Sequence, residues 1–384
     1  MTRFLELLTS VVIVVVLFVL VAVFLPDHRT VEHNSETSHP LRQVFDTLNS
    51  FTHFPEWSPL RQHDPRVKYQ VSGPDTGVGA RLDYSSTRRD IGTGSWHITE
   101  SEQDDHVRYT VYNKAYGQNK NHLLKLTQRG KIVAIDWLYS VDYGWSLPGR
   151  YAGLYVDRTV GDDVKRALAN LTNLISAMPN FDYRNLDVQI MTLPVRNILY
   201  VSTTADRNIT EVENAMDLAL KDIRAAIKKN DLVEAGRPRL ITTNFGAEKY
   251  EFDVAIPVAR VEDQTTLDEA DSAPADDAPA ESETDAQDES YIASEEDTVP
   301  PPPPPLEGLN LPDNVHAGQS YGGRVVMAPY RGHPAALPLI RDQLRSYAVT
   351  FGEKLHDRAF EEYLTEIEET AAEDARFRVF WPIQ

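Results

Sequence analysis

The chain has 384 residues, with 58 acidic side chains against 38 basic ones and no cysteine. The absence of cysteine excludes disulfide bonds and zinc sites built on thiolates. The negative balance and the lack of a stripe of Lys and Arg argue against nucleic acid as a partner. The acidity is local, because 15 Asp and Glu and no basic residue lie between Glu262 and Asp297.

The first feature along the chain is an apolar segment over residues 4–25, which is interrupted only by Glu6, Thr9 and Ser10. A helix of this length spans about 33 Å, enough for the ~30 Å hydrocarbon core of a bilayer. We therefore expect a single transmembrane helix that anchors a soluble remainder.

A cleaved signal peptide is the alternative interpretation of this segment. The residues that follow it, Phe24 to Asp27, lack the small side chains of a typical cleavage site, which favours a retained anchor. Basic residues on the two sides of the segment are nearly balanced, so the positive-inside rule gives little guidance. We expect the soluble part to be exoplasmic or periplasmic rather than cytoplasmic.

Residues 30–178 predict an α+β domain. A helix should begin after Ser38, with an apolar face at helical spacing, and a second helix should close the region with an apolar face from Val160 to Met178. Between the helices, alternation and Gly turns predict strands at residues 67–71, 80–85, 95–99, 107–112, 122–128 and 131–141.

This region resembles the SRPBCC superfamily, in its START-like, polyketide cyclase/dehydrase-like branch. The motifs that carry the resemblance are Trp57-Ser58-Pro59, Asp64-Pro65, Gly77-x-Gly79, Gly92-x-Gly94-Ser95, the strand around Trp137, and Gly153-Leu154-x-x-Asp157. The resemblance implies a helix-grip fold, in which a curved sheet wraps a long helix around an apolar cavity. Trp57 and Trp137 are then candidate ligand-binding residues on its wall.

Residues 185–384 contain one pattern twice. Each arm has an apolar strand (198–201 and 324–327), an amphipathic helix, and a last strand that ends in an apolar-Pro-apolar motif (250–258 and 376–383). The first helix should begin at a capping box, Thr210-x-x-Glu213. The repetition predicts an internal duplication.

This pattern resembles the GyrI-like, or AraC-type, effector-binding domain. The pieces that carry it are Tyr200 to Thr203, Ala235 to Pro238, Phe252 to Val258, and the helix unit from Gly332 to Phe351. The family binds small cationic or apolar molecules in a cleft between its halves, with an acidic residue at the floor, and a few relatives are hydrolases. The resemblance implies candidate ligand-binding residues at Tyr200, Asp253, Tyr330, Tyr347, Arg378 and Trp381.

The chain departs from this family at one position. The family often carries Glu four residues before the final proline, where this chain has Arg378, and the matching residue of the first arm is Asp253. The hydrolase interpretation is weakened accordingly, and a charged ligand on either residue stays open. Strand alternation places Phe252 and Val254 in the core, with Asp253 toward a cleft or solvent.

An acidic, proline-rich insertion at 262–318 interrupts the second arm. Its composition cannot bury enough apolar area to offset chain entropy, so we expect it to be disordered. Its proline run, Pro300 to Pro305, has two interpretations. A solvated insertion is the favoured one, and a docking segment for a protein partner with an aromatic groove is the alternative.

Together these features predict a membrane-anchored protein with two modules that bind or sense small molecules or lipids. A cyclase or hydrolase acting on an apolar substrate is the first alternative, and a non-catalytic interaction scaffold is the second. No catalytic set of side chains is recognisable, and we expect no cofactor and no metal ion. The sequence does not name the ligand, which is expected to be small and apolar or charged.

Overall fold

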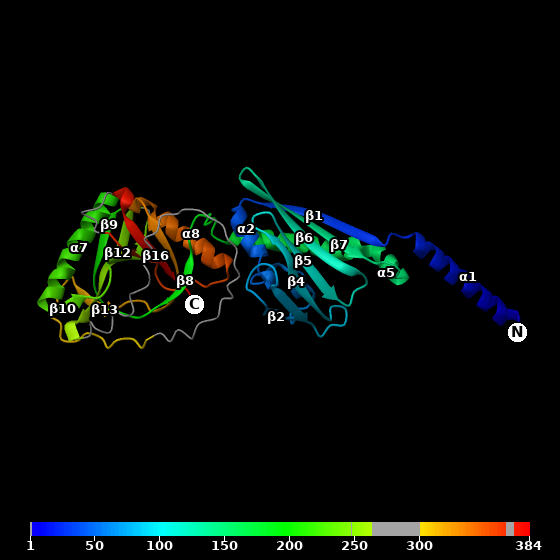
Figure 1. The fold of residues 1–384 in the computed structure, drawn as a ribbon, viewed down its shortest axis with the longest axis horizontal. Coiled ribbons are helices and arrows are strands. Elements are labelled where there is room, and N and C mark those ends of the chain that lie inside the picture. The colour runs from blue at the N-terminus through cyan, green and yellow to red at the C-terminus, as the bar shows by residue number, and fades with distance from the viewer. Residues whose placement is uncertain (1, 247, 263–299, 366–371) are drawn as a thin grey trace, which may run out of the picture. The chain divides into compact units, whose positions relative to one another are not determined.

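The computed structural model describes residues 2–246, 248–262, 300–365 and 372–384 (Figure 1). By the contacts within it, the chain divides into two compact units. Unit 1 comprises Met1–Asn185 with Ser346–Glu353, and unit 2 comprises Leu186–Arg345 with Lys354–Gln384.

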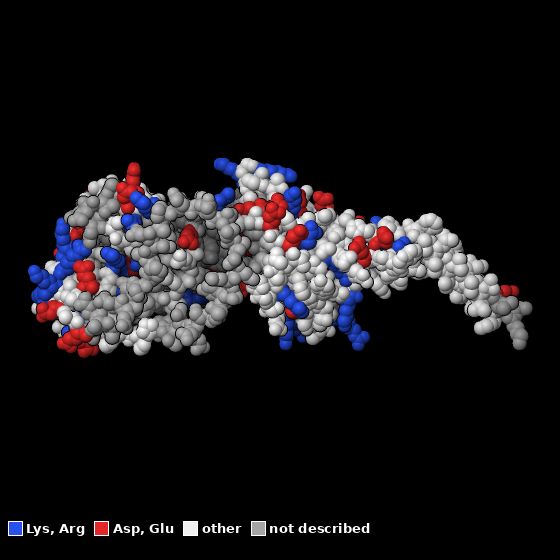
Figure 2. All heavy atoms as spheres, viewed as in Figure 1, with Lys and Arg blue, Asp and Glu red and all other residues white. Residues whose placement is uncertain are grey.

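Unit 1 begins with the apolar helix α1 (Thr2–Phe24). Its segment Glu6–Phe24 is long and apolar enough to cross a membrane, a property that a signal sequence near an N-terminus shares. Among the large apolar side chains along it, Phe4, Val15 and Phe24 are typical in being well exposed. Figure 2 shows the helix as a nearly uncharged surface on the face in view. A continuous apolar surface of this kind marks an interaction site.

The remainder of unit 1 is a seven-stranded antiparallel sheet with helices packed on it. The sheet order is β1-β7-β6-β5-β4-β3-β2. The strands are β1 (His28–Thr37), β2 (Lys68–Ser72), β3 (Arg81–Ser85), β4 (Thr93–Glu102), β5 (His106–Asn113), β6 (Gln118–Arg129) and β7 (Ile132–Asp142). The helices are α2 (Leu41–Leu48), α3 (Phe54–Trp57), α4 (Leu60–His63), α5 (Leu147–Ala152) and α6 (Asp162–Ala177), with short turns of helix at η1 (Gly153–Tyr155) and η2 (Asp157–Gly161).

The core of unit 1 lies between this sheet and α6. The buried face of α6 repeats at helical spacing through Val164, Leu168, Leu171 and Ile175, which join one cluster with the strand residues. The six strands and two main helices predicted from periodicity are all present, with shifted ends. The strand β1 was not predicted, because its residues are mostly polar and only Val31 is fully buried.

Unit 2 is built on a second antiparallel sheet. Its strands are β8 (Gln189–Leu193), β9 (Asn197–Asp206), β10 (Leu232–Glu234), β11 (Arg239–Phe245), β12 (Lys249–Arg260), β13 (His316–Gln319), β14 (Gly323–Arg331), β15 (Phe360–Tyr363) and β16 (Arg376–Pro382). The helices are α7 (Ile209–Lys229) and α8 (Leu337–Thr350), and the residues of α8 from Ser346 onward are grouped with unit 1. Short helical turns lie at η4 (Pro334–Ala336) and η5 (Ala372–Asp374).

The strand order in this sheet is β13-β9-β12-β11-β15-β16-β14-β8, with β10 paired to β12 outside this path. The six central strands are therefore β9-β12-β11 followed by β15-β16-β14. Counted inward from either end, each half presents the first strand of its arm, then the last strand, then the middle one. We expected the last strands of the two arms, β12 and β16, to lie near each other. They are instead separated by β11 and β15, which amounts to about 14 Å at the usual strand spacing, because the middle strand of each arm takes the central position.

Two further details differ from expectation. Helix α7 starts at Ile209, and its cap is Asn208, whose side chain accepts a hydrogen bond from the Thr210 N–H at 3.0 Å. Thr210 is therefore inside the helix and does not cap it.

The second difference from expectation concerns the later part of the insertion that we expected to be disordered. Residues 263–299 lie outside the described residues, but 300–318 are described and pack on unit 2. Leu306, Leu309 and Leu311 contact its apolar core, and β13 pairs with β9. The carbonyl of Pro304 accepts a hydrogen bond from Asn197, at 2.9 Å. The expectation of disorder is wrong for this stretch, because its three leucines give it an apolar face that the acidic part lacks.

Candidate functional site

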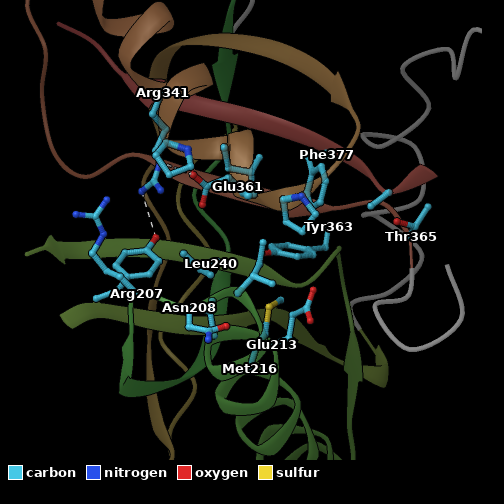
Figure 3. A pocket seen from close by; sticks show the side chains of 18 residues that line it. Arg207, Asn208, Glu213, Met216, Leu240, Arg341, Glu361, Tyr363, Thr365 and Phe377 are labelled. Atoms are coloured by element: carbon cyan, nitrogen blue, oxygen red, sulfur yellow. Dashed lines mark hydrogen bonds and ion pairs between the residues drawn. The ribbon is translucent and has the colours of Figure 1, made fainter. Parts of the chain in front are cut away.

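A cavity of unit 2 lies on the face of the sheet that carries α7 and α8 (Figure 3). It has a volume of about 240 Å³. Its walls come from the start of α7, the start of α8 and the central strands. The lining residues are Arg207, Asn208, Ile209, Val212, Glu213, Met216, Leu240, Tyr250, Pro334, Ala335, Leu337, Pro338, Arg341, Glu361, Tyr363, Thr365, Ala375 and Phe377.

The polar centre of this cavity is Glu361 on β15, which is 1% exposed. Its Oε1 lies 3.0 Å from Nε of Arg341 on α8. The N–H of that nitrogen is not directed at the carboxylate, so the pair is an ionic contact. Among the described residues, no other residue donates a hydrogen bond to either carboxylate oxygen. Burial raises the pKa of Glu361 above its usual range, and the charge of Arg341 partly opposes this.

The guanidinium of Arg341 is held by other contacts. Its Nη1 donates to the hydroxyl of Thr242 and to that of Tyr250, the latter at 3.1 Å (Figure 3). Burial raises the pKa of Tyr250 to about 12, so this phenol is neutral at physiological pH. Burial, followed by the nearby Glu361 carboxylate, raises the pKa of Tyr363 well above its usual range. The cavity thus combines a buried carboxylate that has few hydrogen-bond donors around it with neutral aromatic walls.

Two candidate site residues of the duplicated pattern, Asp253 of the first arm and Arg378 of the second, do not line this cavity. In the ladder Leu240 pairs with Glu361, whereas Asp253 pairs with Ile241 and Arg378 pairs with Glu362. Because neighbouring residues of a strand point to opposite faces, Asp253 and Arg378 belong to the face away from Glu361.

On that opposite face the two residues have separate partners. Asp253 accepts hydrogen bonds from Ser202 and from Arg358, both at 2.6 Å. The Nη2 of Arg378 lies 3.1 Å from Glu362, which also pairs with Arg239. The two residues therefore do not neutralise each other.

The four aromatic candidates are also outside the lining of the cavity. The ring of Tyr200 lies 5.5 Å from that of His316, and the ring of Tyr330 stacks on Phe377 at 6.0 Å. Tyr347 is on α8, in the segment grouped with unit 1, and Trp381 is on β16 with its indole N–H unpartnered. Their role as ligand contacts stays a prediction.

Unit 1 contains a second cavity, of about 160 Å³, between the sheet and the start of α6. Trp57 and Trp137, both candidates from the sequence, line it together with Trp96 and His122. The indole N–H of Trp57 is buried without a hydrogen-bond partner. This cavity therefore offers aromatic walls and at least one unsatisfied donor.

His122 in this wall has a defined protonation state. Its Nδ1 lies 3.0 Å from the indole nitrogen of Trp137, which can only donate, so Nδ1 is the acceptor. Burial lowers the pKa of His122 to about 3, so the ring is neutral and carries its proton on Nε2. His122 is thus a hydrogen-bond donor and a poor general base at neutral pH.

Lys120, two residues before His122 on β6, also lines this cavity. Its ammonium donates to Oδ1 of Asn113 and to the carbonyl of Ala115, both at 2.7 Å, and more weakly to the Asn113 carbonyl. Burial lowers its pKa, but these acceptors satisfy the group, which indicates a structural role.

Sequence reasoning missed Glu361, Arg341 and Tyr363. Strand β15 has only four residues, and its two adjacent glutamates are typical of a loop rather than a buried strand. The signal that could have identified it is the duplication itself, since an equivalent of β11 is required in the second arm.

No protein-family model matches the chain, and no curated protein matches it. Among solved structures, it is similar to a hydrolase from Listeria innocua, with 9% identity over 51% of this chain and 91% of that one and a TM-score of 0.32. It is also similar to the EcmrR C-terminal domain, with 9% identity, 52% and 98% coverage and a TM-score of 0.35. Norcoclaurine synthase from Thalictrum flavum gives 13% identity, 40% and 90% coverage and a TM-score of 0.32. At these values the function has to be argued from the chain's own residues.

Proposed function

We propose that this chain is a membrane-anchored small-molecule-binding protein with one binding cavity in each unit. The observation that carries the proposal is the Glu361 carboxylate, which is buried at a cavity and accepts no hydrogen bond from another residue in the part of the chain that the structure describes. Buried carboxylates in folded proteins normally accept several hydrogen bonds. A ligand that supplies the missing donors would therefore gain binding free energy at this position.

The same observation defines the ligand class. The donors must come from a group that also tolerates a negative neighbour, which favours an ammonium or another N–H donor. The surrounding side chains, such as Val212, Met216 and Leu337, require the rest of the ligand to be apolar. The ligand of unit 2 is accordingly an apolar amine.

The proposal includes a GyrI-like architecture for unit 2. Its support is the symmetric strand order about the β11–β15 pair, with one helix following the first strand of each half. The cavity lies between the starts of those two helices, and its acidic residue is Glu361 rather than Asp253 or Arg378.

Unit 1 is proposed to be a helix-grip module of the SRPBCC type. Its cavity presents N–H donors from Trp57 and His122 between aromatic walls. The matching ligand is an apolar molecule that carries an acceptor oxygen, such as a carbonyl.

The unit 2 assignment is tested with two probes of the same shape. 2-Phenylethylamine is an ammonium at neutral pH, and propylbenzene replaces that group with a methyl. Calorimetric titration of the full chain in detergent should show tighter binding of the amine. A charge-assisted hydrogen bond contributes about 1.5–3 kcal/mol, so Glu361→Gln should weaken amine binding by roughly 10- to 100-fold and leave propylbenzene unchanged.

Glu362→Gln is the matched control, because Glu362 is the next residue of the same strand and points to the opposite face. It should leave the affinity for the amine within about twofold, a difference of roughly 0.4 kcal/mol. Equal binding of both probes by the wild type, or amine binding that survives Glu361→Gln in a folded protein, would remove the assignment.

A further inference from the structure

The end of unit 1 next to α1 carries an unusual group of exposed apolar side chains. Trp145 is 81% exposed, Tyr155 is 60% exposed and Leu154 is 48% exposed. Trp145 lies just before α5, and Leu154 and Tyr155 lie in η1 just after it, all within the segment that runs from β7 to α6. Exposed aromatic and aliphatic side chains gathered in one segment mark an interaction surface.

The chain itself ties this segment to the end of α1. Only Leu25, Pro26 and Asp27 separate α1 from β1, so His28 lies at most about 14 Å from Phe24. Strand β1 pairs with β7 from its first residue, with His28 opposite Asp142. The loop that leaves β7 at Asp142 and leads to α5 therefore starts beside the helix end.

Specific contacts then join α5 to the last turns of α1. The Arg150 guanidinium donates to the carbonyls of Ala22, Val23 and Leu25, at 3.0–3.4 Å. A helix leaves its last carbonyls short of intrahelical donors, although that of Ala22 also accepts from the Leu25 N–H at 3.3 Å. The positive charge also suits the negative end of the helix dipole. Arg150 thus caps the apolar helix from the side of α5.

A second contact reaches deeper along the helix. The ring of Tyr151 stacks on Phe18 with centroids 4.2 Å apart, and its hydroxyl donates to the Phe18 carbonyl at 2.9 Å. Phe18 lies six residues before Phe24, which is about 9 Å along the helix axis. Part of α5 therefore lies alongside the apolar helix and not beyond its end.

We propose that Trp145, Leu154 and Tyr155 form a docking surface for the headgroup interface of the bilayer that α1 crosses. Any membrane that surrounds α1 up to Phe24 must meet a segment that is packed against Phe18 and Ala22. Tryptophan and tyrosine favour this interface, because their rings are apolar at one side and polar at the other. The guanidinium of Arg150 lies 5.2 Å from the Trp145 ring, which restrains that side chain.

The backbone supports the outward direction of these side chains. A Cβ on Gly153 would come within 2.7 Å of the Tyr143 ring. The absence of one lets the turn η1 pack closely on Tyr143, with the following Leu154 and Tyr155 left on the outside. The docking surface would then hold unit 1 in one orientation on the bilayer.

The absence of cysteine from the chain makes a direct test possible, because any introduced cysteine is unique. Leu154→Cys and Tyr155→Cys would each be spin-labelled in the full chain, in phosphatidylcholine vesicles. Collision rates with oxygen, which concentrates in lipid, and with a water-soluble nickel chelate report the depth of the label. We expect high oxygen and low nickel accessibility at both sites.

Two controls separate the outcomes. Val71 lies on β2, at the sheet edge opposite β1, and is an apolar side chain that is 51% exposed. A label at Val71→Cys should show the low oxygen and high nickel accessibility of a site in water. A label at Val15→Cys in α1 should show the high oxygen and low nickel accessibility of a site in lipid. The inference rests on the proposed anchoring, and an aqueous Val15 label would overturn both. A lipid-exposed Val15 label with aqueous labels at 154 and 155 would overturn the docking surface alone.

Discussion

At the scale of single residues, the polarity of each cavity depends on one side chain whose protonation is set by burial. Glu361 is a carboxylate with too few donors around it, and His122 is a neutral imidazole with one nitrogen already occupied. Neither could be identified from the sequence, because adjacent glutamates in a short strand and a single His in a polar strand are most often surface residues. Their chemistry arises from the neighbours that the fold brings to them, Arg341 for one and Trp137 for the other.

His122 leads to a prediction about acid stability. The unfolded chain takes up the histidine proton near pH 6.5, whereas the folded protein does so only near pH 3. Between these values the unfolded state binds more protons, so acid favours unfolding, by about 1.4 kcal/mol per pH unit. From pH 7 to 4.5, this residue should lower the free energy of unfolding of unit 1 by about 2–3 kcal/mol.

The measurement compares the wild type with His122→Gln in chemical denaturation at both pH values. The variant lacks the titrating group and should lose less stability on acidification, although it starts from a lower value at pH 7. Equal pH dependence in the two proteins would show that His122 is not neutral and buried as described. His28→Gln gives a comparison at the surface of the same unit, where the His28 ring pairs with Asp142 at 2.5 Å and both side chains are about half exposed.

At the scale of elements, periodicity predicted the strongly amphipathic helices and the alternating strands, including α6, α7 and β7. Periodicity did not predict elements in which apolar residues do not recur at a regular spacing. Strand β1 is mostly polar and β15 is very short, and both are held by pairing with strands that are distant in sequence. The sequence could not place Asp253 and Arg378 relative to the cavity for a related reason, because a shift of one residue along a strand exchanges the two faces of the sheet. Asp253 and Glu361 could be distinguished only once the ladder register was known.

The acidic insertion gives a prediction at this scale. The stretch 264–298 has the composition of a chain that cannot form a core, whereas 300–318 contains the three leucines that contact unit 2. Replacing 264–298 by a short Gly/Ser linker should change the melting temperature of unit 2 very little, because loop closure depends only logarithmically on length. Leu306→Ala with Leu311→Ala should instead lower it, since each removes apolar contact area. Differential scanning calorimetry of both variants would decide, and a large loss in the linker variant would contradict the disorder prediction.

At the scale of the whole molecule, each unit has a core of its own. The cluster around Trp57, Trp137 and Leu171 belongs to unit 1, and the cluster around Phe252, Val254 and Ile223 belongs to unit 2. Each unit also has its own sheet and its own cavity. Damage to one core should therefore affect its own unit first.

Phe252→Ala tests this independence. Phe252 is 1% exposed, and truncation of a buried Phe costs about 3–5 kcal/mol, a large part of the stability of a domain of this size. Hydrogen exchange of the full chain, read by mass spectrometry, should show faster exchange in peptides from β9, β11, β12 and β16. Peptides from β3 to β7 should keep their wild-type protection. The control is Glu251→Ala, an exposed neighbour on the same strand, which should leave both sets of peptides unchanged. Equal loss of protection in both units after Phe252→Ala would mean that the two sheets unfold as one cooperative body.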